Sequence, residues 1–446
     1  MVSRNILETL PNPRLESATI SRLMWRLMPF LFLLYIVAYL DRINVGFAVL
    51  QMGEPLHLTD RVKGVAFGMF FAGYFFFQVP SNLVLQKVGV RRWICGLMVV
   101  WGLVSCSMIF IRGPHSFYVL RFLLGAAEAG FFPGMILYLK HWFPARARAR
   151  AVAWFMTANP LAGVVGSPIS GALLGLHGKG LAGWQWLFLM EGAPAILLGV
   201  AVLWVLAETP KDAGWLRDDE RKWLVDELSL EEQADSGRRG DFWSVAADWR
   251  VWVLSLVYFG LAAGVYGVIA WLPTAVRSMT NLTNQMIGIV TTIPYLGMAI
   301  AMVLVARHSD HSGERRWHTA GMAFLGAAAL GVAAYGKAPF LVITAMSLGM
   351  LGAQSMVGPF WAMATSRSGG AAAAVTIAII NSIANLGGYF GPYIIGFARS
   401  NNGGFGGLLP IGMVLAVSGC LALVVGATPR GKTQGGSGRG LRPANG

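Results

Sequence analysis

The chain has 446 residues, of which 55% are hydrophobic and only 13% are charged, against roughly 25% charged residues in an average soluble domain. A chain this apolar has too little polar surface to cover a water-soluble globule, and its 56 glycines suit close helix packing in lipid. The composition excludes a soluble fold and predicts an integral, multi-pass membrane protein. The three cysteines are an odd number without metal-site spacing, so neither a disulfide framework nor a metal site is expected.

Apolar stretches of about 20 residues recur along the whole chain, and each is long enough to cross a hydrocarbon core of about 30 Å as a helix. We therefore expect an all-α membrane protein with twelve transmembrane helices. The expected spans are 27–50, 64–86, 93–111, 116–139, 151–176, 186–206, 251–275, 285–306, 319–335, 339–362, 371–396 and 407–428.

The basic residues that give the chain its net charge of +14 lie mostly in the connections between these spans and in the terminal segments. If the N-terminus is cytoplasmic, 26 Lys and Arg residues fall on the cytoplasmic side and 7 on the other. The positive-inside rule then places both termini in the cytoplasm, and a bacterial inner membrane is the expected location. Because this asymmetry accounts for the charge, no nucleic-acid partner is expected, and membrane lipid is the expected surrounding.

A polar stretch at 208–250 divides the spans into two sets of six, and a turn sequence repeats between the sets. Residues 86–92 (QKVGVRR) and 310–316 (DHSGERR) share Gly-x-Arg-Arg at an offset of 224 residues, half the chain. This predicts two similar bundles related by an axis along the membrane normal. The expected organisation is a first six-helix bundle at 1–207, a cytoplasmic linker with a short amphipathic helix at 208–250, a second bundle at 251–430 and a disordered tail at 431–446.

Several motifs resemble one transporter superfamily. The layout of six plus six helices with a basic turn after the second and eighth is similar to the major facilitator superfamily. Further segments of the chain resemble the anion:cation symporter family of this superfamily. They are 39–48 (YLDRINVGFA), 79–83 (VPSNL), 88–93 (VGVRRW), 128–134 (EAGFFPG), 183–188 (GWQWLF), 307–310 (RHSD), Asn381 and 385–392 (NLGGYFGP). The resemblance implies import of organic anions, such as sugar acids, tartrate, phthalate or hydroxyphenylacetate, together with protons. Gln86 and Gln78 depart from the family, which often has acids at these positions.

Five charged residues fall within the expected spans: Asp41, Arg42, Arg121, Glu128 and Glu191. Each costs about 2.5 to 3.5 kcal/mol at the bilayer centre, so an intramembrane charge is by default a functional candidate. Arg121 and Glu128 share a helix face about 10 Å apart along the axis, whereas adjacent Asp41 and Arg42 point about 100° apart. Two interpretations remain open: two buried ion pairs between the first and fourth helices, or fixed positive charge for a carboxylate beside acids that take up protons.

Burial favours the neutral form of a carboxylic acid, and a nearby guanidinium favours its ionised form, so acids in such a cluster can exchange protons near neutral pH. The family resemblance implies that Asp41 and Glu128 carry protons and that Arg42 contacts the anion. Arg121 is a further candidate for the anion, and Glu191 is expected to pack near the outer interface.

Polar residues near the middle of the spans complete a candidate substrate pocket, although hydrogen bonding between helices is the more common explanation for any single one. They are Tyr39, Tyr74, Gln78, Asn159, Trp361, Asn381 and Asn385. Trp361 stands out because Gly358 and Pro359 are expected to break the helix beside it. At the cytoplasmic ends, an ion-pair latch that closes an inner gate is expected from Arg91, Arg92, Asp310, Arg315 and Arg316.

The sequence therefore predicts a secondary transporter that imports an organic carboxylate with protons by alternating access. The expected carrier is a monomer, is not an enzyme, and needs no metal or cofactor apart from the coupling protons. Two alternatives remain: an exchanger or uniporter of organic anions, and more distantly a transporter-like membrane sensor.

Overall fold

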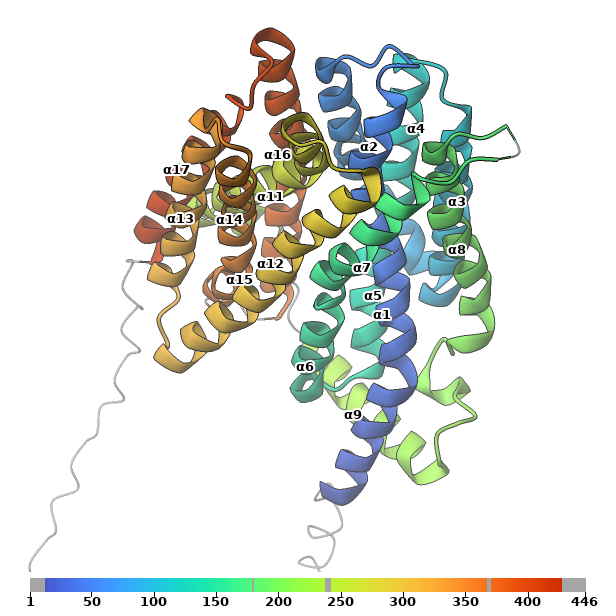
Figure 1. Ribbon diagram of the computed structural model, residues 1–446. Helices are drawn as coiled ribbons and strands as arrows, with labels where there is room; N and C mark the ends of the chain where they lie inside the picture. Colours follow the sequence, from blue (N-terminus) through green and yellow to red (C-terminus); the bar gives the residue numbers. More distant parts are fainter. Residues whose placement is uncertain (1–12, 179, 237–241, 367–369, 427–446) are drawn as a thin grey trace, which may run out of the picture.

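The computed structural model describes residues 13–178, 180–236, 242–366 and 370–426, so the expected tail at 431–446 lies outside the described part. The described chain is built from helices, and its β content is one isolated bridge between Gly178 and Leu181. Figure 1 shows the helices gathered into two bundles, one from each half of the sequence.

The first bundle contains α1 (Pro13–Met52), α2 (Asp60–Val88), α3 (Val90–Ser107), η2 (Met108–Phe110), α4 (Pro114–Glu128), α5 (Phe131–Trp142), α6 (Ala145–Met156), α7 (Ala158–Leu173) and α8 (Gly183–Val205). The connection holds η3 (Pro210–Asp212), α9 (Asp218–Ser236) and α10 (Phe242–Ala246). The second bundle contains α11 (Trp249–Met279), α12 (Asn284–Ser312), α13 (Arg316–Tyr335), α14 (Pro339–Ser355), α15 (Val357–Thr365), α16 (Gly370–Asn402) and α17 (Leu408–Gly426).

Ten helical segments of the described chain are long and apolar enough to cross a membrane. They correspond to ten of the twelve spans expected from the sequence. The other two expected spans, 151–176 and 371–396, are helical as well: the first is divided into α6 and α7 near Thr157, and the second lies within α16. The predicted all-α membrane fold is therefore confirmed.

The two repeated turns have the same backbone feature. Gly89, between α2 and α3, has φ of +90°, and Gly313, which ends α12, has φ of +67°. Residues other than glycine rarely adopt such angles. The two glycines occupy the same place in the 224-residue repeat, but their ψ angles are 153° and 0°, so the two turns share a positive φ and not the whole backbone path.

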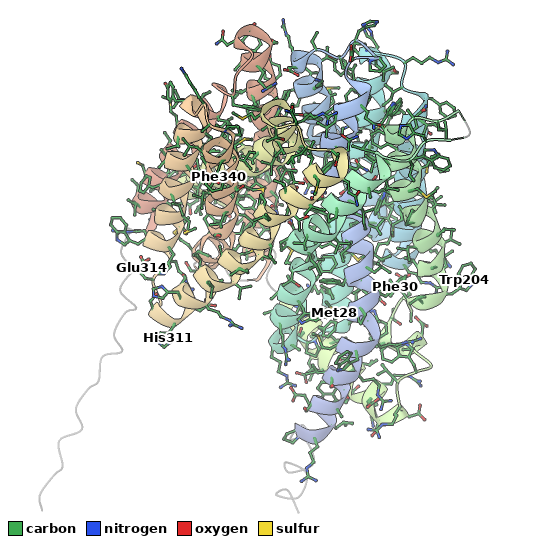
Figure 2. The ribbon with its side chains drawn as sticks, viewed as in Figure 1. Met28, Phe30, Trp204, His311, Glu314 and Phe340 are labelled. Atoms are coloured by element: carbon green, nitrogen blue, oxygen red, sulfur yellow. The ribbon has the colours of Figure 1, made fainter. Side chains whose placement is uncertain are left out.

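Exposed tryptophans gather at the end of the molecule where α1 begins and α17 ends, which we call the terminal end. They are Trp25, Trp154, Trp204, Trp243, Trp249, Trp252 and Trp317. Figure 2 shows Trp204 pointing away from the first bundle. Tryptophan is enriched where a bilayer meets water because its ring is apolar and its N–H is polar. Exposed tryptophans on these segments are the pattern expected of a helical membrane protein near a bilayer surface.

The two bundles meet at the end opposite to α9 and diverge toward the terminal end (Figure 1). Close approach at the opposite end depends on glycine. A Cβ on Gly288 of α12 would lie 2.5 Å from the carbonyl oxygen of Ser167 in α7, and one on Gly396 of α16 would lie 2.6 Å from that of Asp60 in α2. These distances are too short for any larger residue without displacement, so the helices pack backbone to backbone and close this end.

An ion pair also joins the bundles at the closed end. Arg399 Nε of α16 lies 3.1 Å from Asp60 Oδ2 of α2, and the Arg399 guanidinium stacks over the rings of Trp271 and Phe405. Arg399 is 9% and Asp60 20% exposed, so water screens the pair only partly. The pair can exist only while the two bundles are together at this end.

Replacing Arg399 by glutamine is expected to open the closed end more often. In a background without the three native cysteines, Val45→Cys would report this opening, because Val45 lines a small void just inside the closure. We expect about five-fold faster labelling by an impermeant thiol reagent, which corresponds to about 1 kcal/mol. Arg277→Gln is the matched control, since Arg277 bonds to Leu282 within its own bundle. Equal labelling in both variants would show that the Arg399 pair does not hold the closure.

Candidate substrate and proton site

A cavity of about 130 Å³ lies between the two bundles, and both halves supply its walls. Phenol and amide groups form most of its polar lining. From the first half these are Tyr35, Tyr74, Gln78 and Asn159, together with the guanidinium of Arg42, and from the second half they are Tyr258, Tyr266, Gln354, Asn381 and Asn385. Such groups can hydrogen-bond hydroxyl and carboxylate oxygens, so the cavity suits a small polar anion.

Arg42 supplies the positive charge at this cavity. Its Nε and Nη2 donate to Glu128 Oε1 at 2.8 and 2.5 Å, and its Nη1 donates to the hydroxyl oxygen of Tyr266 at 3.3 Å. The guanidinium also lies over the rings of Phe70 and Tyr74, each about 5.3 Å away. Because 13% of the Arg42 side chain remains exposed, the charge can be reached from the cavity.

Glu128 lies behind Arg42 and is only 1% exposed. It is the last residue of α4, where the expected fourth span breaks before α5 begins at Phe131. Oε1 receives both bonds from Arg42, whereas Oε2 is buried without a hydrogen-bond partner in the described chain. Glu128 therefore has one oxygen on the guanidinium and one free to carry a proton.

Asp41 faces away from the cavity, as expected for a neighbour of Arg42. Its carboxylate is fully buried, and Oδ1 accepts hydrogen bonds from Ser105 Oγ of α3 at 2.6 Å and from Asn44 Nδ2 at 3.2 Å. Its other oxygen, Oδ2, has no partner among the described residues. Asp41 thus lies inside the first bundle rather than on the substrate-facing surface.

Arg121, the further candidate for the anion, does not line the main cavity in this conformation. It is 2% exposed, its Nε donates to the Ala66 carbonyl oxygen at 3.4 Å, and its guanidinium lies over the Phe70 ring at 5.0 Å. Arg42 and Arg121 both border a void of about 10 Å³ toward the closed end. The void is too small for an organic anion, so in this conformation Arg121 supplies buried positive charge.

The remaining predicted pocket residues divide between the cavity and its supports. Tyr74, Gln78, Asn159, Asn381 and Asn385 line the cavity, and Asn385 Nδ2 donates to Gln78 Oε1 across the two bundles at 3.2 Å. Tyr39 and Trp361 do not line it. Tyr39 is buried against Arg42, and Trp361 Nε1 donates to the hydroxyl oxygen of Tyr258 at 3.3 Å.

The helix break expected beside Trp361 is confirmed: α14 ends at Ser355 and α15 begins at Val357, just before Gly358 and Pro359. The corresponding span of the first half breaks beside Glu128. Both breaks therefore lie next to candidate site residues, one in each bundle.

Sequence reasoning missed several cavity residues, above all Tyr266, which bonds to Arg42 from the opposite half. Tyr35, Tyr258 and Gln354 also belong to the lining. The sequence does contain a pattern that could have predicted Tyr266. It lies near the middle of an apolar span between Gly264 and Gly267, and a polar hydroxyl group at this depth is expected to face the protein interior rather than lipid.

The five residues expected to latch the terminal end are not joined to one another across the two bundles. Arg91 donates to the carbonyl oxygen of Leu203 within the first bundle, and Asp310 pairs with Arg315 at 2.5 Å within the second. Arg92 is exposed, and the Arg316 guanidinium lies over the Trp317 ring. Because the bundles diverge here (Figure 1), a latch between them stays a prediction for the opposite conformation.

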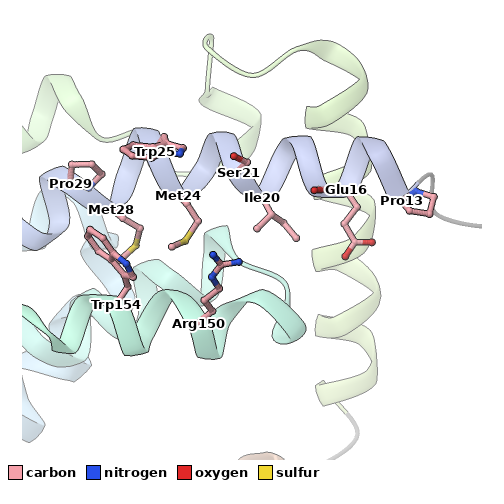
Figure 3. A pocket seen from close by; sticks show the side chains of 11 residues that line it. Pro13, Glu16, Ile20, Ser21, Met24, Trp25, Met28, Pro29, Arg150 and Trp154 are labelled. Atoms are coloured by element: carbon pink, nitrogen blue, oxygen red, sulfur yellow. The ribbon is translucent and has the colours of Figure 1, made fainter. Parts of the chain in front are cut away.

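A larger cavity of about 730 Å³ lies at the start of α1 (Figure 3), and Arg42 is not among the residues that line it. Its lining comes from α1 and α6 and includes Glu16, Trp25, Arg150 and Trp154. All of these residues belong to the first bundle. A movement of one bundle against the other would not expose this cavity to each side of the membrane in turn, so it is not the transport site.

Comparison with known proteins identifies the family. The Major Facilitator Superfamily model matches residues 31–392 and 254–443. The chain belongs to the major facilitator superfamily. It is thus a membrane transporter, and the family resemblance predicted from the sequence is confirmed.

Curated relatives of this superfamily member include a candidate tartrate transporter of Agrobacterium vitis, 48% identical over 94% of this chain and 96% of the relative. The inner membrane transport protein RhmT of Escherichia coli K12 is 36% identical over 85% of this chain and 88% of its own. Among solved structures, a bacterial homologue of the lysosomal transporter Spinster superposes with a TM-score of 0.73 at 15% identity, covering 91% of this chain and 97% of that one. A D-xylose–proton symporter gives 0.69 at 16% identity, covering 90% and 96%. At these identities the structures establish the fold alone.

Proposed function

We propose that this transporter imports an organic carboxylate together with protons. The observation that carries the proposal is the Arg42–Glu128 ion pair, in which a carboxylate of the protein itself binds the guanidinium that faces the cavity. A substrate carboxylate and Glu128 compete for the same guanidinium. Protonation of Glu128 removes the competitor and leaves Arg42 free for the anion, so substrate and proton bind together.

This competition gives the order of events. A proton adds to the unpartnered Oε2 of Glu128, the pair with Arg42 weakens, and the anion takes its place with Tyr266 as a further hydrogen-bond donor. Without the proton, a bound anion and Glu128 would leave excess negative charge in a poorly solvated site, which is costly. The loaded and the empty carrier are the states with balanced charge, so these are the states that rearrange.

Asp41 is proposed as a second proton carrier. It is buried in the same helix as Arg42 and has one oxygen without a partner. Protonation of Asp41 makes the net charge of the cluster more positive by one unit, and the Asp41 side chain does not occupy the cavity. When both acids are protonated, the two positive charges of the arginines balance the two negative charges of a bound dicarboxylate. When no substrate is bound, the ionised acids balance the same two arginines.

The substrate class is proposed from the lining and the relatives together. Amide and phenol groups on both walls suit an anion that also bears hydroxyl groups. Two relatives at 48% identity are named for tartrate, a hydroxylated dicarboxylate. We infer a small hydroxylated carboxylate, carried by a single chain because the cavity lies between its own two halves.

The terminal end is proposed to face the cytoplasm of a bacterial cell, because the basic connections lie there. The structure would then be closed to the outside by the Asp60–Arg399 pair and the glycine contacts. The labelled Val45→Cys position tests this orientation as well. An impermeant reagent added to intact cells reaches it only if the closed end faces outward.

Uptake by proteoliposomes tests the function. A panel of tartrate, a sugar acid, phthalate and hydroxyphenylacetate would be offered with and without an imposed proton gradient, and with and without anion inside. We expect at least one anion, most readily tartrate, to accumulate above its external concentration only when the outside is acidic. Uptake that depends on internal anion and ignores the gradient would instead establish exchange.

A further inference from the structure

A groove between α1 and α6 has a polar end and an apolar end. It is the cavity of about 730 Å³ that lies outside the transport site (Figure 3). The polar residues of its α1 wall, Glu16, Ser17 and Ser21, all lie near the start of the helix. The later lining residues of α1, from Met24 to Pro29, are methionine, tryptophan and proline. The groove therefore changes from polar to apolar in the direction in which α1 enters its expected span.

The α6 wall has the same order. Arg150 and Trp154 are four residues apart, so they lie on one face of α6, about 6 Å apart along its axis. Figure 3 shows Arg150 pointing toward α1 on the side of Glu16, and Trp154 beside Met28 farther along the groove. Both walls become apolar in the same direction, which is the arrangement expected for an amphipathic ligand.

The groove lies at the level where a bilayer is expected to meet water. The first and fifth expected spans begin at residues 27 and 151, just after Trp25 and Arg150. Trp25 is 81% and Trp154 49% exposed, and such tryptophans are typical of the interfacial layer. That layer is about 5 to 8 Å thick on each side of the hydrocarbon core, close to the axial separation of Arg150 and Trp154. Lipid head groups are therefore expected to reach Arg150, and acyl chains to reach Trp154.

Arg150 supplies a positive charge that no other side chain uses. It is exposed, and within the described residues its side chain has neither an ion pair nor a hydrogen bond. The other two arginines of α6 are paired, Arg146 with Glu16 at 2.7 Å and Arg148 with Glu231 at 2.7 Å. Glu16 uses Oε1 for its pair, so its Oε2 remains available to a ligand. The groove thus presents a free cation near the hydrocarbon boundary and a carboxylate oxygen nearer to water.

We propose that the groove binds a phospholipid with a primary-ammonium head group, phosphatidylethanolamine, with its phosphate on Arg150, its ammonium on Glu16 and an acyl chain against Trp154. Arginine matches a phosphate with two parallel N–H donors. A primary ammonium has three N–H donors, one of which can bond to Glu16 Oε2. The order of the three lipid groups, from hydrocarbon to water, is the order of the three residues along the groove.

Other ligands match the groove less well. The quaternary ammonium of phosphatidylcholine has no N–H to donate to Glu16, and phosphatidylglycerol has no cation at this place. A soluble phosphate would occupy Arg150 and leave the apolar half of the groove uncovered. The proposal therefore requires a preference for the head group and a contribution from the acyl chain. Because both walls belong to the first bundle, the lipid site is separate from the transport site.

Native mass spectrometry of the purified transporter measures lipid binding directly and needs no transported anion. Phosphatidylethanolamine, phosphatidylcholine and phosphatidylglycerol with identical acyl chains would be titrated. The parent should bind the first at least about tenfold more tightly, the effect of one charge-assisted hydrogen bond. Arg150→Gln should weaken binding of all three at least about tenfold, because all three carry the phosphate. Glu16→Gln should remove the preference, while Arg146 keeps its pair with Glu227.

Arg26→Gln is the matched control, since Arg26 is an exposed arginine of α1 that does not line the groove. Ser21→Trp fills the groove at an exposed position without removing a charge, and it should weaken binding of all three lipids. Equal binding of the three lipids by the parent, or parental binding by Arg150→Gln and Ser21→Trp, would overturn the proposal. Glycerophosphoethanolamine that binds as tightly as the lipid would overturn it in favour of a soluble ligand. A dimer that Ser21→Trp dissociates would overturn it by placing a second copy of the chain in the groove.

Discussion

Replacing Arg42 by glutamine is expected to raise the dissociation constant for the transported anion at least about 100-fold and to abolish uptake. Arg42 is the arginine that faces the inter-bundle cavity, and it donates from two nitrogens to a carboxylate in the empty protein. Each hydrogen bond to a charged group contributes about 1.5 to 3 kcal/mol, so two account for this loss. Calorimetric titration with the anion that gives the strongest uptake is the measurement.

Arg42→Lys is the matched variant for this experiment. Lysine keeps the charge but cannot present two parallel donors, so about tenfold weaker binding is expected. Glutamine leaves Glu128 buried without a cation, and Glu128 is then expected to remain protonated rather than to unfold the protein. Size-exclusion chromatography checks folding. Binding of near-parental strength by folded Arg42→Gln would remove Arg42 from the substrate site.

Glu128→Gln is expected to abolish accumulation driven by a pH gradient while leaving exchange of labelled for unlabelled anion intact. The variant frees Arg42 at every pH, because glutamine cannot compete as a carboxylate for the guanidinium. Substrate binding should change less than about tenfold and lose the part of its pH dependence that comes from Glu128. Uptake with an imposed gradient, compared with counterflow without one, separates the two effects.

The control for Glu128 is Glu54→Gln, which removes an exposed acid from the turn after α1. This variant should accumulate the anion as the parent does. If Glu128→Gln still accumulates the anion in response to an acidic exterior, Glu128 does not carry the coupling proton, and Asp41 becomes the remaining candidate.

Local sequence was sufficient to predict an integral, multi-pass membrane protein and its helical spans. Apolar length sets whether a helix can cross a bilayer, and the position of a residue along that helix sets its depth. The same logic placed Asp41 and Arg42 on different faces of one helix, and it placed a break beside Trp361 because Gly and Pro disfavour a continuous helix.

Only the tertiary structure decided which charges meet. Periodicity gives the faces of one helix, but the rotation of each helix about its axis and its choice of neighbour come from side-chain packing between distant segments. That packing paired Arg42 with Glu128 and Tyr266, placed Arg121 outside the main cavity, and buried Glu191 beside Ser170. It also determined which end is closed, because the Asp60–Arg399 pair and the glycine contacts join residues from opposite halves of the chain.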